Sequence, residues 1–97
     1  MSVLTVKPAV TGSVGGTSAV LVAANRGRRS ITVVNTHASQ FLHINLATAE
    51  GVAPTAVVGS SHIFLGPNGG SWTETQYAGA AAIIGSGAGT TYSLLEF

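Results

Sequence analysis

The sequence predicts an all-β protein: a jelly-roll-like antiparallel β-sandwich of about eight short strands with an extended N-terminal arm. Three observations favour this fold class. Apolar and polar residues alternate in several short runs, which is the period of a half-buried strand. Turn-forming residues, mainly Gly with Asn and Pro, separate these runs at short intervals. No segment repeats apolar residues at helical spacing over a length that would form an isolated helix.

The chain is expected to divide at residue 17. Residues 1–17 would form the N-terminal arm and a Gly-rich linker, and residues 18–97 would form the β-sandwich domain. Residues 2–6 have strand character, and a detached strand can pair with the sheet edge of a neighbouring subunit. An ordinary first strand of the same domain is the alternative interpretation.

The clearest strand prediction is the run FLHINL at 41–46, where three apolar residues face one side and two polar residues face the other. Residues 30–35 begin with the same alternation and are rich in β-branched side chains, which favour strands. The remaining strands are predicted at 18–23, 62–65, 71–75, 80–84 and 90–97.

Three connections between these strands have a distinctive composition. Residues 66–70 (GPNGG) form a dense turn signal. Residues 47–59 contain Gly51 and Pro54 and are expected to form the long crossing segment of a Greek-key topology. Residues 85–89 (GSGAG) resemble a phosphate-binding loop, but a strand rather than a helix follows and no Gly-Lys-Ser/Thr is present. A hairpin loop is the better interpretation.

Charge is the most unusual feature of the composition. Only 7% of the residues are charged, against roughly 25% in a typical soluble domain, and the net charge is +1. Four cations are too few for a polyanion-binding face, which argues against a nucleic-acid partner. A near-neutral chain with so few charges favours association. The composition therefore indicates an assembly subunit whose surface is partly covered by other chains; a neutral, Thr-rich domain that stays soluble alone is the alternative.

The sequence contains no constellation that predicts catalysis. Its three Glu residues lie more than twenty positions apart, and no Gly-x-Ser-x-Gly motif is present. The histidines His37, His43 and His62 have no carboxylate at ligand spacing, and the chain has no Cys for a zinc ribbon. The longest near-apolar stretch, 78–85, is far shorter than the ~20 residues that span a bilayer. We therefore predict no enzyme activity, cofactor, metal or membrane partner.

Two features predict contact with a partner protein. The turn 25–29 (NRGRR) concentrates three arginines, which could grip an acidic surface or simply form a solvated turn. Trp72 lies on the same predicted strand face as Glu74, so it is either an exposed interface anchor or a cap on one end of the core. Together with the arm, the predicted interface residues are Val3, Leu4, Val6, Arg26, Arg28, Arg29 and Trp72.

Four runs within residues 18–97 carry a resemblance to a known group of proteins. They are NRGRRSITVVNT at 25–36, LHI at 42–44, IFLGPNGG at 63–70 and GAGTT at 87–91. In this order they resemble small β-sandwich proteins from the virions of tailed bacteriophages. Members of that group act as capsid decoration (cement) proteins or as minor virion and tail components.

The resemblance implies a decoration protein that binds the outer head shell at subunit junctions and stabilises it. Its implied partners are the major capsid protein and further copies of itself, as a homodimer or homotrimer. The protein would be made in the host cytoplasm and reside on the head surface of the virion. The alternative is a carbohydrate- or receptor-binding β-sandwich module of a phage tail fibre or minor tail protein, for which exposed Trp72, Tyr77 and Tyr92 would be the signature.

Overall fold

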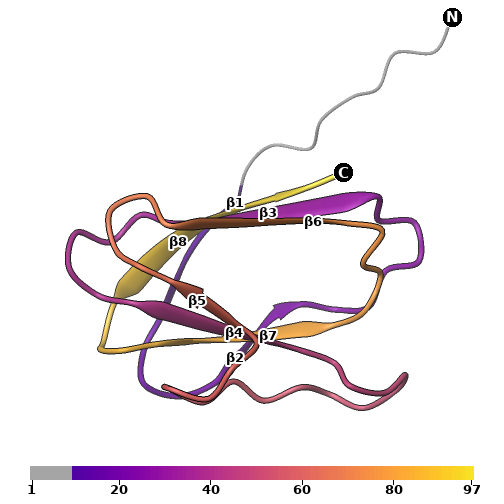
Figure 1. Ribbon diagram of the computed structural model, residues 1–97, viewed down its shortest axis with the longest axis horizontal. Helices are drawn as coiled ribbons and strands as arrows, with labels where there is room; N and C mark the ends of the chain where they lie inside the picture. The colour runs from indigo at the N-terminus through magenta and orange to yellow at the C-terminus, as the bar shows by residue number, and fades with distance from the viewer. Residues whose placement is uncertain (1–9) are drawn as a thin grey trace, which may run out of the picture.

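The computed structural model describes residues 10–97, which form two four-stranded antiparallel sheets packed face to face (Figure 1). The prediction of an all-β sandwich is confirmed, and the described residues contain no helix. The strands are β1 (Val10–Val14), β2 (Ala19–Val22), β3 (Ser30–Asn35), β4 (Leu42–Leu46), β5 (Ile63–Leu65), β6 (Ser71–Thr75), β7 (Ala81–Gly85) and β8 (Thr90–Glu96).

The strand order shows how the chain winds between the two layers. Sheet A has the order β1-β8-β3-β6 and sheet B has the order β2-β7-β4-β5. The first strand thus pairs with the last, the second with the seventh, the third with the sixth, and the fourth with the fifth. This is the pairing expected when one long hairpin of eight strands is folded across two sheets.

The hydrophobic core lies between the sheets and follows from strand alternation. In β3 the residues Ile31, Val33 and Asn35 are fully buried, whereas the residues between them are partly exposed. In β4 the apolar residues Leu42 and Ile44 point into the same core. The other core side chains come from β1, β2, β5, β7 and β8: Val14, Leu21, Val22, Leu65, Ala81, Ile83 and Leu94.

The structure corrects the predicted boundary at residue 17. Val10–Val14 forms β1 and pairs with β8 along its whole length, so the first part of the expected linker belongs to the sandwich. Gly12 lies opposite Tyr92, and a Cβ at position 12 would lie 2.5 Å from the Tyr92 ring. Glycine is required here because the ring packs on the strand, not because the chain needs a hinge. The predicted arm residues Val3, Leu4 and Val6 lie outside the described residues.

The structure also corrects the prediction for residues 85–89. These residues connect β7 in sheet B to β8 in sheet A, so they form a crossing between layers rather than a hairpin loop. The crossing is fixed by Thr90, which is fully buried and whose hydroxyl donates to the carbonyl oxygen of Gly87 at 2.8 Å. The turn at 66–70 likewise crosses from β5 to β6. The long segment after β4 returns within sheet B to β5.

Candidate interaction surfaces

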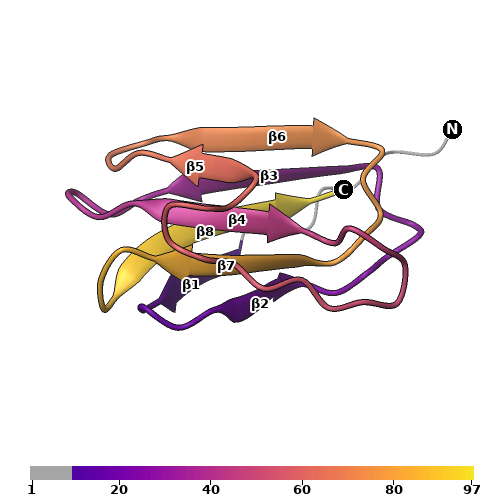
Figure 2. The same ribbon diagram turned by 60° about the horizontal axis from the view of Figure 1, so that its bottom comes forward.

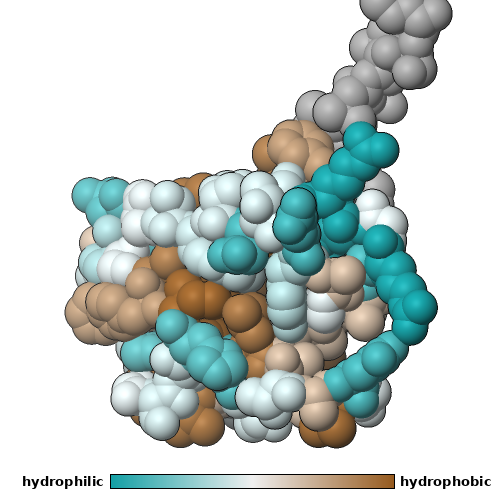
Figure 3. Space-filling view, turned by 45° about the vertical axis from the view of Figure 1, so that its right-hand side comes forward, coloured by the Kyte–Doolittle hydropathy of each residue, from teal (hydrophilic) through white to brown (hydrophobic). Residues whose placement is uncertain are grey.

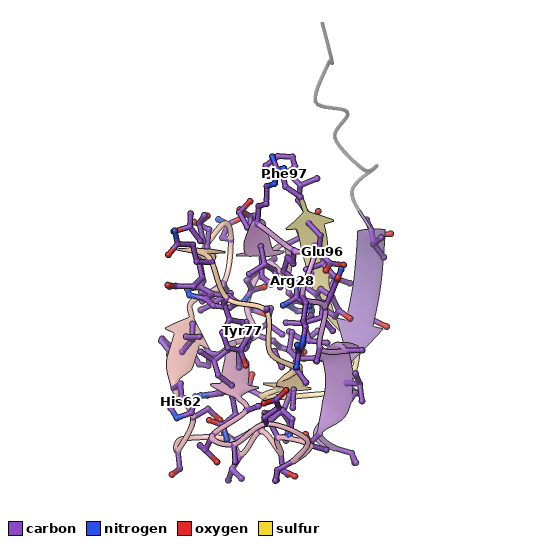
Figure 4. All side chains as sticks on the ribbon, turned by 90° about the vertical axis from the view of Figure 1, so that its right-hand side faces the viewer. Arg28, His62, Tyr77, Glu96 and Phe97 are labelled. Carbon is purple, nitrogen blue, oxygen red and sulfur yellow. The ribbon has the colours of Figure 1, made fainter. Side chains whose placement is uncertain are left out.

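Arg28 is held inside the fold. Its guanidinium donates to Oε2 of Glu96 at 2.8 Å and to the carbonyl oxygens of Tyr77, Gly79 and Ala23 at 3.0, 2.9 and 2.7 Å (Figure 4). The side chain has no solvent exposure, and each of its three nitrogen atoms donates to an acceptor from the β6–β7 connection, the β2–β3 connection or β8. Arg28 therefore cannot grip a partner, and this part of the sequence prediction is wrong.

The other two arginines of the same turn are exposed and behave differently. Arg26 forms an ion pair with Glu50, with 2.7 Å between Nη2 and Oε1, and both side chains are more than four-fifths exposed. Arg29 is positioned by its backbone: its N–H donates to the carbonyl oxygen of Phe97 and its own carbonyl accepts from Gln76. The expected patch of three arginines is thus reduced to Arg29 and a paired Arg26.

Trp72 lies opposite Val33 in the β3–β6 register and packs against the core while remaining partly exposed. This position agrees with the interpretation that Trp72 caps the core. Leu46 and Ile63 are partly buried against the same core, on the sheet opposite Trp72. Figure 3 shows apolar residues gathered in the middle of one face of the molecule, with polar residues above and below them.

Asn35 is a structural residue that the sequence reasoning missed. It is fully buried at the end of β3, and its Nδ2 donates to the carbonyl oxygens of Gln40 and Leu65 at 2.8 and 3.1 Å. Its Oδ1 accepts from the backbone N–H of His37 at 2.9 Å. A signal was available: the alternation of β3 places position 35 on the same face as Ile31 and Val33.

The three histidines do not converge. Nδ1 of His37 accepts backbone N–H groups within its own loop, and Nδ1 of His62 accepts from the N–H of Leu46 at 3.0 Å. The ring of His43 packs beside the ring of Phe64, with centroids 5.1 Å apart. Within residues 10–97 no three His, Cys, Asp or Glu side chains are grouped so that they could hold a metal ion.

The outer surface of sheet B exposes apolar side chains. Phe64 is 57% exposed and its ring lies 5.3 Å from that of Phe41, while Val20 at the other edge of the sheet is 75% exposed. Val57 and Val58, from the β4–β5 connection, are each about half exposed. We call these five side chains the apolar face. The strands of sheet B contain no charged residue, so no ionic group interrupts this face.

The β4–β5 connection covers the middle of sheet B. In Figure 2 it runs across the front of the sheet before it returns to β5. Ala56 is buried against Ala82 and Ile84, which point outward from β7, and the N–H of Ala56 is held by the Ser18 hydroxyl at 2.9 Å. Both faces of β7 are therefore buried, which explains why its sequence AAIIG does not alternate.

The outer surface of sheet A has the opposite character. The pairing registers place one set of residues on this face, and all but Val34 and Leu95 are Ser or Thr. Two cross-strand hydroxyl pairs form there, Thr32 with Thr73 at 2.9 Å and, at its margin, Thr36 with Thr91 at 3.0 Å. We call this the hydroxyl face: Thr11, Ser13, Ser30, Thr32, Val34, Ser71, Thr73, Thr75, Thr91, Ser93 and Leu95.

Comparisons with protein-family models, curated proteins and solved structures found no match for this chain. Among the described residues, no helix is long and apolar enough to cross a membrane. The functional argument therefore depends on the two faces and on the residues that form them.

Proposed function

We propose that this protein is an assembly subunit that docks through the apolar face of sheet B. The observation that supports the proposal is the contrast between the two outer surfaces. Exposed Phe and Val side chains lie on a charge-free sheet, and hydroxyl groups cover the opposite sheet. Contact with another protein removes apolar area from water at a gain of roughly 25 cal/mol per Å². The hydroxyl face can hydrogen-bond water, so it is the side suited to remain exposed.

The particular assembly that we propose is the head shell of a tailed bacteriophage. The protein would act there as a decoration (cement) protein, with the major capsid protein and further copies of itself as partners. Two features support this assignment: the resemblance carried by residues 18–97, and a composition with only 7% charged residues. A rigid sandwich that adds buried area across subunit junctions opposes rupture of the shell without needing a catalytic group.

The alternative, a carbohydrate- or receptor-binding tail module, has less support. Trp72 and Tyr92 pack against the core rather than standing free on the surface. The hydroxyl of Tyr77 donates to the carbonyl oxygen of Ala80 and accepts from the N–H of Ala47. The three aromatic residues that would have marked a sugar platform thus serve the fold, at least in part.

Co-sedimentation with purified empty phage heads tests the proposal. We expect the wild-type chain to pellet with the heads and to saturate them at a copy number comparable to the number of subunit junctions in the shell. Phe64→Lys should abolish this binding because it replaces an exposed ring of the apolar face with a charge that docking would have to bury. Ser71→Lys introduces the same charge on the hydroxyl face and should bind as the wild type does.

Urea unfolding of both variants verifies that each is folded, so that a loss of binding reports on the surface. Equal binding by the Phe64→Lys variant and the wild-type chain would refute docking through the apolar face. A wild-type chain that remains monomeric and does not bind heads at any concentration would refute the decoration function itself.

A further inference from the structure

A cavity of about 540 Å³ opens at the end of the sandwich where Arg28 and Tyr77 lie (Figure 4). Three connections form its walls: β2–β3, β4–β5 and β6–β7. Its volume is within the range of 300–1,000 Å³ that is usual for small-molecule sites. Neither the apolar face nor the proposed docking to the head uses this cavity.

Several polar backbone groups in the walls of the cavity are already hydrogen-bonded within the fold. The Tyr77 hydroxyl bridges two of them, donating to the carbonyl oxygen of Ala80 at 2.6 Å and accepting from the N–H of Ala47 at 3.0 Å. The Ala78 carbonyl accepts from the N–H of Asn25 at 2.8 Å. The Arg28 guanidinium donates to the carbonyl oxygens of Tyr77 and Gly79, on either side of Ala78. Mostly alanine side chains remain to face an occupant, and their small size keeps the space open.

The rim of the cavity carries one positive and one negative group. Arg26 and Glu50 both line the cavity, pair with each other and are highly exposed. Since both side chains are highly exposed, this ion pair contributes at most about 1 kcal/mol and can open at little cost. Together the two groups are neutral, so a ligand with a net charge would attract one of them and repel the other.

From this geometry we propose that the cavity binds an uncharged, apolar amide, such as an aliphatic or aromatic residue within a peptide. Its apolar group enters among the alanines. Its amide N–H donates to the Glu50 carboxylate, and its carbonyl oxygen accepts from the Arg26 guanidinium. Each of the two charged groups therefore keeps a hydrogen-bond partner when the ion pair opens. The charge balance of the rim is what selects a neutral ligand over a carboxylate or an amine.

The first experiment titrates the ¹⁵N-labelled protein with N-acetylphenylalaninamide and follows the amide resonances by NMR. We expect saturable shifts at residues 47–53 and 77–80. Phenylacetate and phenethylamine, which carry one negative and one positive charge, should bind more weakly. Shifts that fail to saturate at millimolar probe, or that spread evenly over the molecule, would overturn the proposal.

Two variants locate the site and test the role of the rim. Ala49→Trp should fill the cavity and remove the saturable shifts, whereas Ala38→Trp, an exposed position in the β3–β4 connection, should leave them unchanged. Glu50→Gln leaves Arg26 without its carboxylate and should reverse the preference, so that phenylacetate binds more tightly than the neutral amide. An unchanged order of affinities would refute the rim's role. Docking to heads should survive Ala49→Trp, which separates this proposal from the proposed function.

Discussion

At the scale of single residues, β3 is fixed by one buried polar side chain at each end. Arg28 precedes the strand and joins the β2–β3 and β6–β7 connections to β8, and Asn35 ends the strand and joins it to the β3–β4 connection and to β5. Each is satisfied, and no buried side-chain N or O atom among the described residues lacks a partner. The sequence could indicate Asn35 through its phase in the strand. It could not indicate Arg28, because arginine is almost always exposed and its acceptors come from distant positions.

Replacing Arg28 with Met should strongly destabilise the protein. The change keeps much of the side-chain volume but leaves the Glu96 carboxylate and three carbonyl oxygens without their donor. Arg28 is fully buried and Glu96 is 24% exposed, so the loss in the free energy of unfolding should approach the ~3 kcal/mol that is typical when one member of a buried ion pair is removed. Arg26→Met is the matched control and should cost less than about 1 kcal/mol, since its pair with Glu50 is exposed. Equal losses in urea unfolding would contradict this account.

Tyr92 should make stability depend on alkaline pH. Burial raises the pKa of its phenol above the ordinary value of 10.0, because the ionised form is poorly solvated beside the core. The neutral phenol is thus favoured by folding, and its contribution is complete below the unfolded pKa and is lost as pH rises through the folded pKa. Urea unfolding at pH about 8 and about 11 measures the loss. The decrease in the free energy of unfolding between these pH values should be smaller for Tyr92→Phe than for the wild type. An equal decrease in both proteins would refute the role of Tyr92.

At the scale of elements, the sequence predicted strands best where alternation was regular. β3 and β6 have the predicted bounds, β4, β5 and β8 differ from the prediction by one residue at one end, and β2 and β7 differ by one residue at each end. β1 was assigned to a linker because its sequence VTGSV contains glycine and little apolar surface. Its strand structure depends on β8, and in particular on Tyr92 packing over Gly12. A pairing between the two ends of the chain leaves no local signal.

A chain that begins at Thr17 should therefore fail to fold stably. It lacks β1, so the backbone of β8 becomes an unpaired edge and the core loses the buried Val14. We expect a clearly lower midpoint in urea or aggregation during purification, compared with a chain that begins at Val10 and keeps β1 intact. If the shorter chain instead unfolds at the same urea concentration, β1 is dispensable and the original boundary at residue 17 would be the better description.

At the scale of the whole molecule, alternation shows which side chains share a face but not what covers that face. The sequence placed His43 opposite Leu42 and Ile44 correctly, yet it could not show that Phe64 and Ile84 flank it in the sheet. Nor could it show that the charged residues avoid sheet B, since sheet membership follows from pairing between distant strands. The apolar and hydroxyl faces emerge only when the eight strands are assigned to their two layers.

This division of the surface predicts how association responds to salt. Docking through the apolar face involves no ion pair, so raising NaCl from about 0.05 to about 1 M should not weaken binding to heads, and sulfate should strengthen it. Docking through Arg26 and Arg29 would respond in the opposite way, because screening weakens contacts between exposed charges. Co-sedimentation with heads across this range of NaCl distinguishes docking through the apolar face from docking through the arginines. The control is the double variant Arg26→Ser and Arg29→Ser. Since these arginines lie outside sheet B, the double variant should bind as the wild type does; a salt-sensitive wild type and a non-binding variant would instead place the interface at the arginine turn.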